Sequence, residues 1–129
     1  MLFRSADPRV RLIENLNARD LSAAHLAAPP DLIVCDVSFI SLKLALPPAL
    51  ALAAPGARLI ALIKPQFEAG RAALGKGGIL RDDAARAAVV ADITGWLGTE
   101  QGWRVIGTAL SPVEGGDGNI EYLIHAEKP

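Results

Sequence analysis

The sequence predicts an α/β protein built around a mostly parallel sheet. Short apolar runs alternate along the chain with segments of helical periodicity, an order that is typical of helices packed on a parallel sheet. The runs at 31–37 and 58–64 are apolar on both faces, which is typical of strands covered by helices on both sides. The chain has 129 residues, 51% of them hydrophobic, and so suits one domain with one core.

Five segments are predicted to be strands, and they lie at 10–15, 31–37, 58–64, 103–110 and 120–126. The last segment alternates in character, with Ile120, Tyr122 and Ile124 on one face and a more polar set on the other. Such alternation is typical of a strand that faces water on one side. The last segment is therefore predicted to lie near an edge of the sheet.

Helices are predicted between these runs. Segment 41–56 has the composition of a helix that Pro47 and Pro48 kink or restart, before a Pro-Gly turn into the next strand. Segment 81–102 carries apolar residues at helical spacing, has acidic residues in its first turn and ends at a glycine. A short helix is expected at 21–30, where a proline pair closes it.

Composition excludes several classes of protein. The formal net charge is −1, which argues against a chain that is basic throughout and binds nucleic acid over its whole surface. The single cysteine, Cys35, excludes an intramolecular disulfide framework and favours a reducing compartment. The longest uncharged run, between Lys43 and Arg58, is shorter than the roughly 20 apolar residues of a membrane span. Because the N-terminus also lacks the apolar core of a signal peptide, we expect a cytoplasmic protein.

Charged side chains stand at the ends of three predicted strands. Asp36 ends the second run, Lys64 ends the third, and Glu121 lies near the start of the last. Ligands of open α/β sheets bind at the carboxyl ends of the parallel strands. An antiparallel last strand would bring Glu121 to that same edge. The three side chains are therefore predicted to converge on one site.

Lys64 has two interpretations. Pro65 fixes its own backbone and favours an extended Lys64, so the ammonium group projects from the strand end. Such a lysine takes part in a reaction, or it is a surface lysine whose stem packs on the sheet. Ser41 is expected to cap the helix that follows it. No metal site is predicted, because the two histidines lie at no ligand spacing to each other or to the cysteine.

The loop after the third run is rich in glycine and basic residues. Arg71 and Lys76 lie in it and Arg81 follows it, so the loop suits phosphate contacts but also suits a plain surface. The stretch at 114–119, EGGDGN, is predicted to be a turn before the last strand rather than a phosphate cradle.

Four blocks of the sequence are similar to consecutive blocks of one protein family. The blocks are DPRVRLIENLNARDL, PDLIVCDVSFISL, LIALIKPQFEAGRAALGKGGILRD and SPVEGGDGNIEYLIH. In this order they resemble the TlyA family, whose members are often labelled hemolysins but look like S-adenosylmethionine-dependent RNA ribose methyltransferases of the FtsJ group. The resemblance runs from about Asp7 to His125, and its most specific parts are D-V-S-F-I-S and K-P-Q-F-E.

The resemblance implies a Rossmann-like methyltransferase sheet with an antiparallel last strand. FtsJ-like enzymes place a Lys-Asp-Lys-Glu tetrad around the target 2′-hydroxyl group. Asp36, Lys64 and Glu121 match the Asp, the second Lys and the Glu of that tetrad. Lys64 would activate or steady the ribose hydroxyl group as it attacks the methyl group, and the two carboxylates would hold the lysines and the hydroxyl group in line.

The resemblance also implies a cofactor and a partner. The cofactor is S-adenosylmethionine, and the residues assigned to it are Asn17, Asp36, Val37 and Ser38. Of these, Asn17 matches the position that meets the adenine, and the others border the methionine part. The partner is ribosomal RNA or a ribosomal subunit, and the residues expected to contact the RNA are Arg71, Lys76 and Arg81.

The sequence departs from the family pattern in its first part. The S4-type RNA-binding domain, the first two strands with their glycine-rich cofactor loop, and the first lysine of the tetrad have no counterpart. Residues 1–129 are therefore expected to be a partial, C-terminal methyltransferase domain that is weakly active or inactive alone. The alternative is a non-catalytic remnant that binds RNA or another protein. A membrane-active hemolysin is a third reading, but no long apolar or basic amphipathic segment supports it.

The missing strands predict an exposed sheet edge. In the family sheet they separate the third strand from the fourth, so segment 31–37 would keep an unpaired, apolar edge. Either segment 10–15 pairs with that edge, or two copies of the chain pair there, or the fold is marginally stable. We expect self-association.

Overall fold

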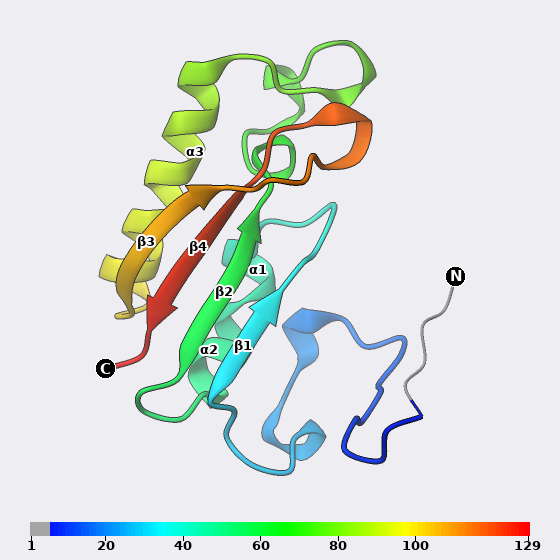
Figure 1. The fold of residues 1–129 in the computed structure, drawn as a ribbon, viewed down its shortest axis with the longest axis vertical. Helices are drawn as coiled ribbons and strands as arrows, with labels where there is room; N and C mark the ends of the chain where they lie inside the picture. The colour runs from blue at the N-terminus through cyan, green and yellow to red at the C-terminus, as the bar shows by residue number, and fades with distance from the viewer. Residues whose placement is uncertain (1–5) are drawn as a thin grey trace.

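The computed structural model describes residues 6–129, apart from the side chain of Asp117, and shows a four-stranded mixed sheet (Figure 1). The strands are β1 (Leu32–Cys35), β2 (Arg58–Ile63), β3 (Arg104–Leu110) and β4 (Tyr122–Glu127). Their order is β1-β2-β4-β3, with β1 parallel to β2 and β4 antiparallel to both of its neighbours. The first three strands therefore run in one direction and the last runs in the other, which confirms the predicted fold class.

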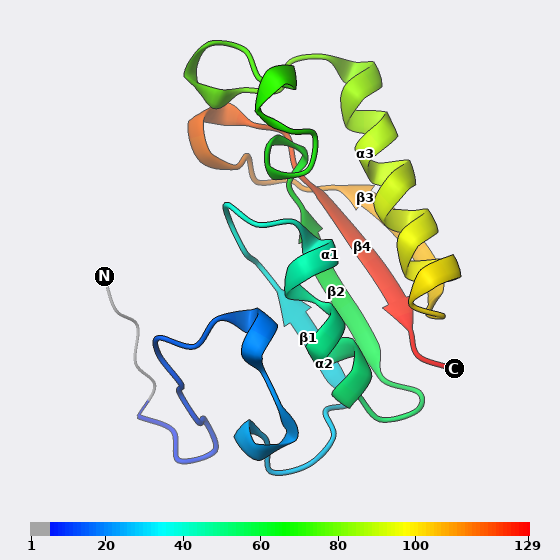
Figure 2. The same ribbon diagram turned by 180° about the vertical axis from the view of Figure 1, so that it is seen from behind.

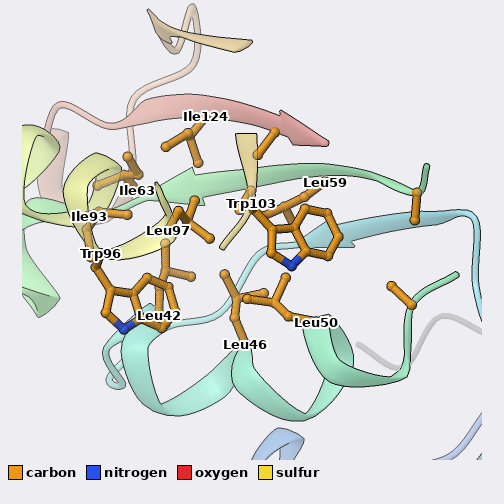
Figure 3. Packing of buried hydrophobic residues seen from close by; sticks show 14 of the residues in the cluster. Leu42, Leu46, Leu50, Leu59, Ile63, Ile93, Trp96, Leu97, Trp103 and Ile124 are labelled. Atoms are coloured by element: carbon orange, nitrogen blue, oxygen red, sulfur yellow. The ribbon is translucent and has the colours of Figure 1, made fainter. Parts of the chain in front are cut away.

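The helices lie on one face of this sheet (Figures 1 and 2). They are α1 (Leu42–Ala45), α2 (Pro47–Leu52) and α3 (Asp83–Gly95), and a π turn (Trp96–Glu100) extends α3. Between helices and sheet lies one apolar layer (Figure 3), which includes Leu42, Leu46, Leu50, Leu59, Ile63, Ile93, Trp96, Leu97, Trp103 and Ile124. Burial of each such aliphatic side chain contributes roughly 1.5–3 kcal/mol, so this layer is the main source of stability.

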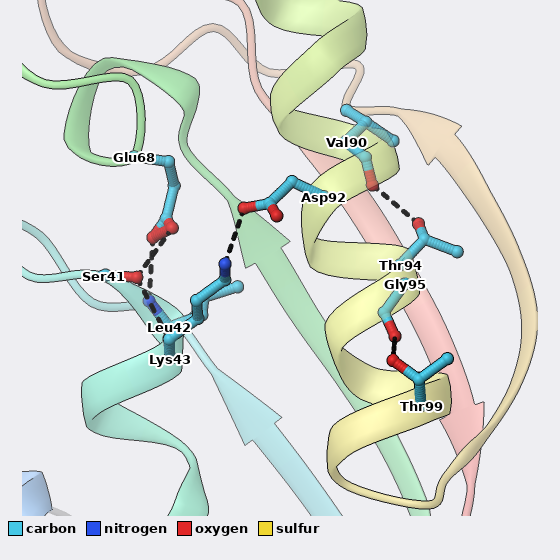
Figure 4. Close-up of polar contacts among 9 residues, drawn as sticks. All are labelled: Ser41, Leu42, Lys43, Glu68, Val90, Asp92, Thr94, Gly95 and Thr99. Carbon is cyan, nitrogen blue, oxygen red and sulfur yellow. Dashed lines mark hydrogen bonds and ion pairs between the residues drawn. The ribbon is translucent and has the colours of Figure 1, made fainter.

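Polar contacts fix where the first helices begin. Ser41 accepts a hydrogen bond from the Lys43 amide at 3.1 Å and donates one to the Glu68 carboxylate at 2.9 Å (Figure 4). Pro47 starts α2 directly after α1, in agreement with the predicted restart, because a proline at the first turn of a helix loses no intrahelical bond. Lys43 also pairs with Asp92 of α3 at 2.8 Å, which ties the two helical parts together.

One predicted strand is wrong. Segment 10–15 is not a strand: it has no strand pairing, and Val10, Leu12 and Ile13 are 53%, 51% and 40% exposed. A strand needs a neighbour for its backbone hydrogen bonds, and this segment has none among the described residues. The helix predicted at 21–30 is also reduced, to a single 3₁₀ turn at Ala23–His25.

The prediction that helices cover the sheet on both faces is also wrong for the described residues. Leu32 and Val34 of β1 are 58% and 72% exposed, and Ile60 of β2 is 41% exposed. Their neighbours along each strand pack in or against the core, so by strand alternation these side chains lie on the face opposite the helices. β1 and β2 therefore expose apolar side chains on the face of the sheet that the helices do not cover.

The last strand is not at an edge. β4 pairs with β2 and with β3 over its whole length, from Tyr122 to Glu127. Its alternation arises because one side of the sheet is covered and the other is not: Ile124 and Ala126 are fully buried, whereas Leu123 and His125 are half-buried. The edges are formed instead by β1 and β3.

Candidate functional site

A cleft opens at the carboxyl end of β1 and β2, where β4 begins. Its volume is about 780 Å³, and Asp36, Lys64 and Glu121 all line it. Asp36 follows β1, Lys64 follows β2, and Glu121 immediately precedes β4. Because β4 is antiparallel, its first residues reach the same edge as the last residues of its parallel neighbours. The structure thus brings together the three side chains that the strand ends predicted.

Lys64 interacts with two side chains that follow the carboxyl end of β1. Its Nζ atom lies 2.5 Å from Asp36 Oδ1 and donates a hydrogen bond to Ser38 Oγ at 3.1 Å. The Lys64 backbone is extended, with φ −113° and ψ 93°, as the proline after it predicted. An ammonium group has three N–H donors, so one donor of Lys64 remains for an oxygen atom in the cleft.

Glu121 is buried on the other side of the cleft. It is 5% exposed and accepts a hydrogen bond at 2.9 Å from Nε2 of Gln66, which is equally buried. Gly115 leaves the space that the carboxylate occupies, since a Cβ atom there would overlap it. The Oε1 atom of Gln66 has no hydrogen-bond partner among the described residues. The sequence did not indicate this pairing.

A second hollow adjoins the cleft on the side of the N-terminal segment. Its volume is about 690 Å³, and Asn17, Val37 and Ser38 line it. These three residues are those that the resemblance assigned to a cofactor, together with Asp36. Ser38 also lines the first cleft, so the two hollows meet at this serine.

Phe39 stands between the two hollows. It lines both, is 88% exposed and has a φ of 63°, a strained backbone conformation for a bulky side chain. Its ring packs against that of Phe67, with 4.8 Å between the centroids. The sequence analysis did not single out this aromatic pair, because a positive φ and an exposed ring leave no periodic signal.

The three predicted RNA-contacting residues lie in one exposed loop, but only Arg71 lines the cleft. Lys76 lies in the 3₁₀ turn Lys76–Gly78, and Arg81 donates a hydrogen bond to the Lys76 carbonyl group at 3.3 Å. Opposite the loop, segment 114–119 forms a turn around Gly116–Gly118, as predicted.

Two other groups near the strand ends serve the fold. Glu68 caps α1, and burial raises the pKa of its carboxyl group above the ordinary value, while the hydrogen bonds from the Leu42 amide and from Ser41 act in the opposite direction. Burial, with a smaller contribution from the charge of Asp36, raises the pKa of Cys35 to about 11. This cysteine is half-buried in β1 on the helix-covered side.

The described residues include no group of three or more His, Cys, Asp or Glu side chains that could hold a metal ion. Within the same part of the chain, no helix is long and apolar enough to cross a membrane.

The fold and the cleft belong to a known class of protein. The FtsJ-like methyltransferase family matches residues 3–128, so the chain belongs to this family. Its part of the fold recurs in a solved structure of a hemolysin-labelled protein from Streptococcus thermophilus, with a TM-score of 0.89 and 40% identity. That match covers 95% of this chain and 44% of the other.

Two curated relatives have names that specify a reaction. The chain is 44% identical over 124 residues to YqxC of Bacillus subtilis, which is labelled an rRNA methyltransferase. It is 40% identical over 118 residues to the 16S/23S rRNA (cytidine-2′-O)-methyltransferase TlyA of Mycobacterium tuberculosis. These matches cover 95% and 92% of this chain but 44% of each relative, so the chain spans under half of their length. The resemblance to TlyA inferred from the sequence is confirmed.

Proposed function

We propose that residues 1–129 form the part of an S-adenosylmethionine-dependent rRNA ribose 2′-O-methyltransferase that holds the target ribose. The observation that carries this proposal is the convergence of Asp36, Lys64 and Glu121, from three strands, on one cleft. Two relatives that share this stretch are named as rRNA methyltransferases. The chain spans under half of each relative's length, so the activity of the whole protein is part of this proposal.

The described residues fit one wall of a cofactor site. The second hollow has the size of a small-molecule pocket and combines the apolar side chains of Leu44, Phe39 and Phe67 with the polar groups of Asn17 and Ser38. Apolar faces and a few polar groups are what an adenosine needs. S-adenosylmethionine, held by these residues, would supply an electrophilic methyl group.

In this proposal Lys64 acts on the ribose oxygen. Its ion pair with Asp36 and its hydrogen bond to Ser38 fix the direction of the ammonium group. The remaining N–H donor would bind the 2′-oxygen and stabilise negative charge on it while the hydroxyl proton passes to solvent water, the oxygen gains the methyl group and S-adenosylhomocysteine departs as the leaving group. Glu121 would orient the hydroxyl group from the other side of the cleft.

The loop with Arg71, Lys76 and Arg81 would contact the RNA backbone. Arg71 lines the cleft and would contact a phosphate next to the target ribose, while the other two cations lie farther along the loop. Phe39 offers an exposed ring at the junction of the hollows, where a nucleobase would stack.

Calorimetric titration with S-adenosylhomocysteine tests the cofactor part of the proposal. Binding by the wild-type chain that Asp36→Ala abolishes and the distant control Gln101→Ala preserves would support it. A folded wild-type chain that releases no heat would show that this part of the protein does not bind the cofactor by itself. In that case the second candidate function, RNA recognition without methyl transfer, remains, and the exposed basic loop is the observation that favours it.

We further propose that two copies of the chain associate along β1. The outer edge of β1 pairs with no strand among the described residues, and Leu32 and Val34 on it are strongly exposed. An exposed apolar strand edge is a template for pairing with another chain. Light scattering at micromolar concentration should give the mass of a dimer or a larger species, and a clean monomer would count against the proposal.

A further inference from the structure

Asn119 is a buried polar residue that the proposed reaction does not use. It is 4% exposed and lies in the turn before β4, between the glycines of that turn and Glu121. Its side chain spans the gap between two loops, 70–81 and 114–121, which lie side by side in both ribbon views (Figures 1 and 2).

The side chain of Asn119 ties these two loops together. Its Oδ1 atom accepts a hydrogen bond from the Leu80 amide at 3.0 Å. Its Nδ2 atom donates to the carbonyl groups of Gly78 and Gly116, each at 3.2 Å. The orientation of the amide is unambiguous, because an amide N–H needs an acceptor and carbonyl groups need donors. Three hydrogen bonds therefore satisfy one buried side chain.

The loop depends on this anchor. Most residues of this loop are exposed, so the loop buries little surface. Gly77 and Gly78 have φ values of 76° and 74°, in the left-handed region that favours glycine. The hydrogen bonds within it are local, such as those from Leu74 to Arg71 and from Gly78 to Gly75. Leu80 is the exception: it is 2% exposed, and its carbonyl group also accepts a bond from Arg86 at 2.9 Å. A segment with few buried contacts opens easily unless specific bonds hold it.

The same residue also supports the place of Glu121. The Gly115 amide donates to the Asn119 carbonyl group at 2.8 Å and closes the turn. Gly115 in turn leaves the space for the Glu121 carboxylate. The backbone of Asn119 thus holds the glycine beside Glu121, and its side chain holds the loop that carries Arg71.

We propose that Asn119 is a positioning residue that holds the RNA-contacting loop 70–81 against the turn that precedes Glu121. The phosphate contact and the reaction centre then keep a fixed arrangement relative to each other. This inference rests on the proposed function, since it takes the basic loop to be an RNA contact. Asn119 itself touches no RNA. It acts by keeping Arg71 ordered before the RNA arrives, which removes the ordering cost from binding.

Limited trypsin digestion of the full chain tests the anchor. Asn119→Ala should accelerate cleavage after Arg71 and Lys76 by about tenfold or more, because each lost hydrogen bond is worth roughly a factor of five in the opening equilibrium. Cleavage after Arg104 in β3 reports global unfolding and should change much less. Gln101→Ala serves as the matched control. Unchanged cleavage in the loop of Asn119→Ala would overturn the inference.

Binding of a short, labelled single-stranded RNA separates positioning from direct contact. Asn119→Ala should weaken binding roughly fivefold to tenfold, since the loop must then be ordered on binding. The slope of log affinity against log salt should stay unchanged, because no cation is lost. Arg71→Ala should reduce that slope by about 0.7, the value for one phosphate contact to a single strand.

The NMR signals of the Gln66 side-chain amide report on the position of the Glu121 carboxylate, to which this amide donates a hydrogen bond. These signals should shift in Asn119→Ala, because that variant loses the side-chain bond to the Gly116 carbonyl group in the turn beside Glu121. They should stay in place in Gln101→Ala. An open loop with unchanged RNA affinity would overturn the inference and leave the proposed function standing. A wild-type chain that binds no RNA would overturn the proposed RNA contact, and the inference with it, before any variant is compared.

Discussion

Segment 10–15 and β2 were both predicted to be strands and share the run Arg-Leu-Ile, yet only β2 forms a strand. β2 lies between β1 and β4, and its Leu59, Ala61 and Ile63 are 1% exposed or less. In segment 10–15, Leu12 is 51% exposed and no strand pairing forms. β1, with a neighbour on one side only, is intermediate. Apolar pattern makes a segment suitable for a sheet, but the number of strand neighbours decides whether its side chains are buried.

Core truncation should give the largest contrast between these segments. Leu59→Ala removes a fully buried side chain and should lower the free energy of unfolding by roughly 2–5 kcal/mol. Leu12→Ala removes a half-exposed side chain and should change it by less than about 0.5 kcal/mol. Urea titration monitored by circular dichroism measures both. Equal losses would mean that segment 10–15 is packed in solution.

Thiol reactivity should distinguish the two faces of β1. With its pKa raised to about 11, Cys35 is about 0.1% thiolate at pH 8, whereas an ordinary exposed thiol with a pKa of about 8.5 is about a quarter thiolate. In a Val34→Cys variant, iodoacetamide should therefore modify position 34 more than about 100-fold faster than Cys35. Mass spectrometry of the two sites during one reaction gives the ratio. Similar rates would show that β1 is not a strand with one covered face.

A charge on the exposed side of β1 should have a smaller effect, which is on self-association. Val34→Lys places a cation on the exposed side of β1 and should weaken self-association by about tenfold, since edge lysines oppose strand pairing. Leu12→Ala, in the unpaired segment, should leave it unchanged. Light scattering over a concentration series measures both variants. Association that Val34→Lys leaves intact would place the contact elsewhere on the chain.

Part of the candidate site was predictable from the sequence, because the end of a strand can be recognised where an apolar run stops at a charged residue. Asp36 and Lys64 stand where apolar runs stop, and an antiparallel last strand brings Glu121 to them. The buried bond from Gln66 to Glu121 and the anchor at Asn119 were not predictable. Both join segments about 40 or more residues apart, and a single polar residue carries no periodic signal of its distant partner. The catalytic and binding roles remain predictions.

The sequence by itself determined the α/β class, the positions of all four observed strands, and the polar residues that follow β1 and β2. It also determined the restart of the helix at Pro47, because proline has no N–H to continue one. Only the tertiary structure decided which apolar run stays unpaired, that β4 lies inside the sheet, and that one face is bare. Those outcomes depend on which segments find neighbours, and neighbours are a property of the folded chain rather than of any local pattern.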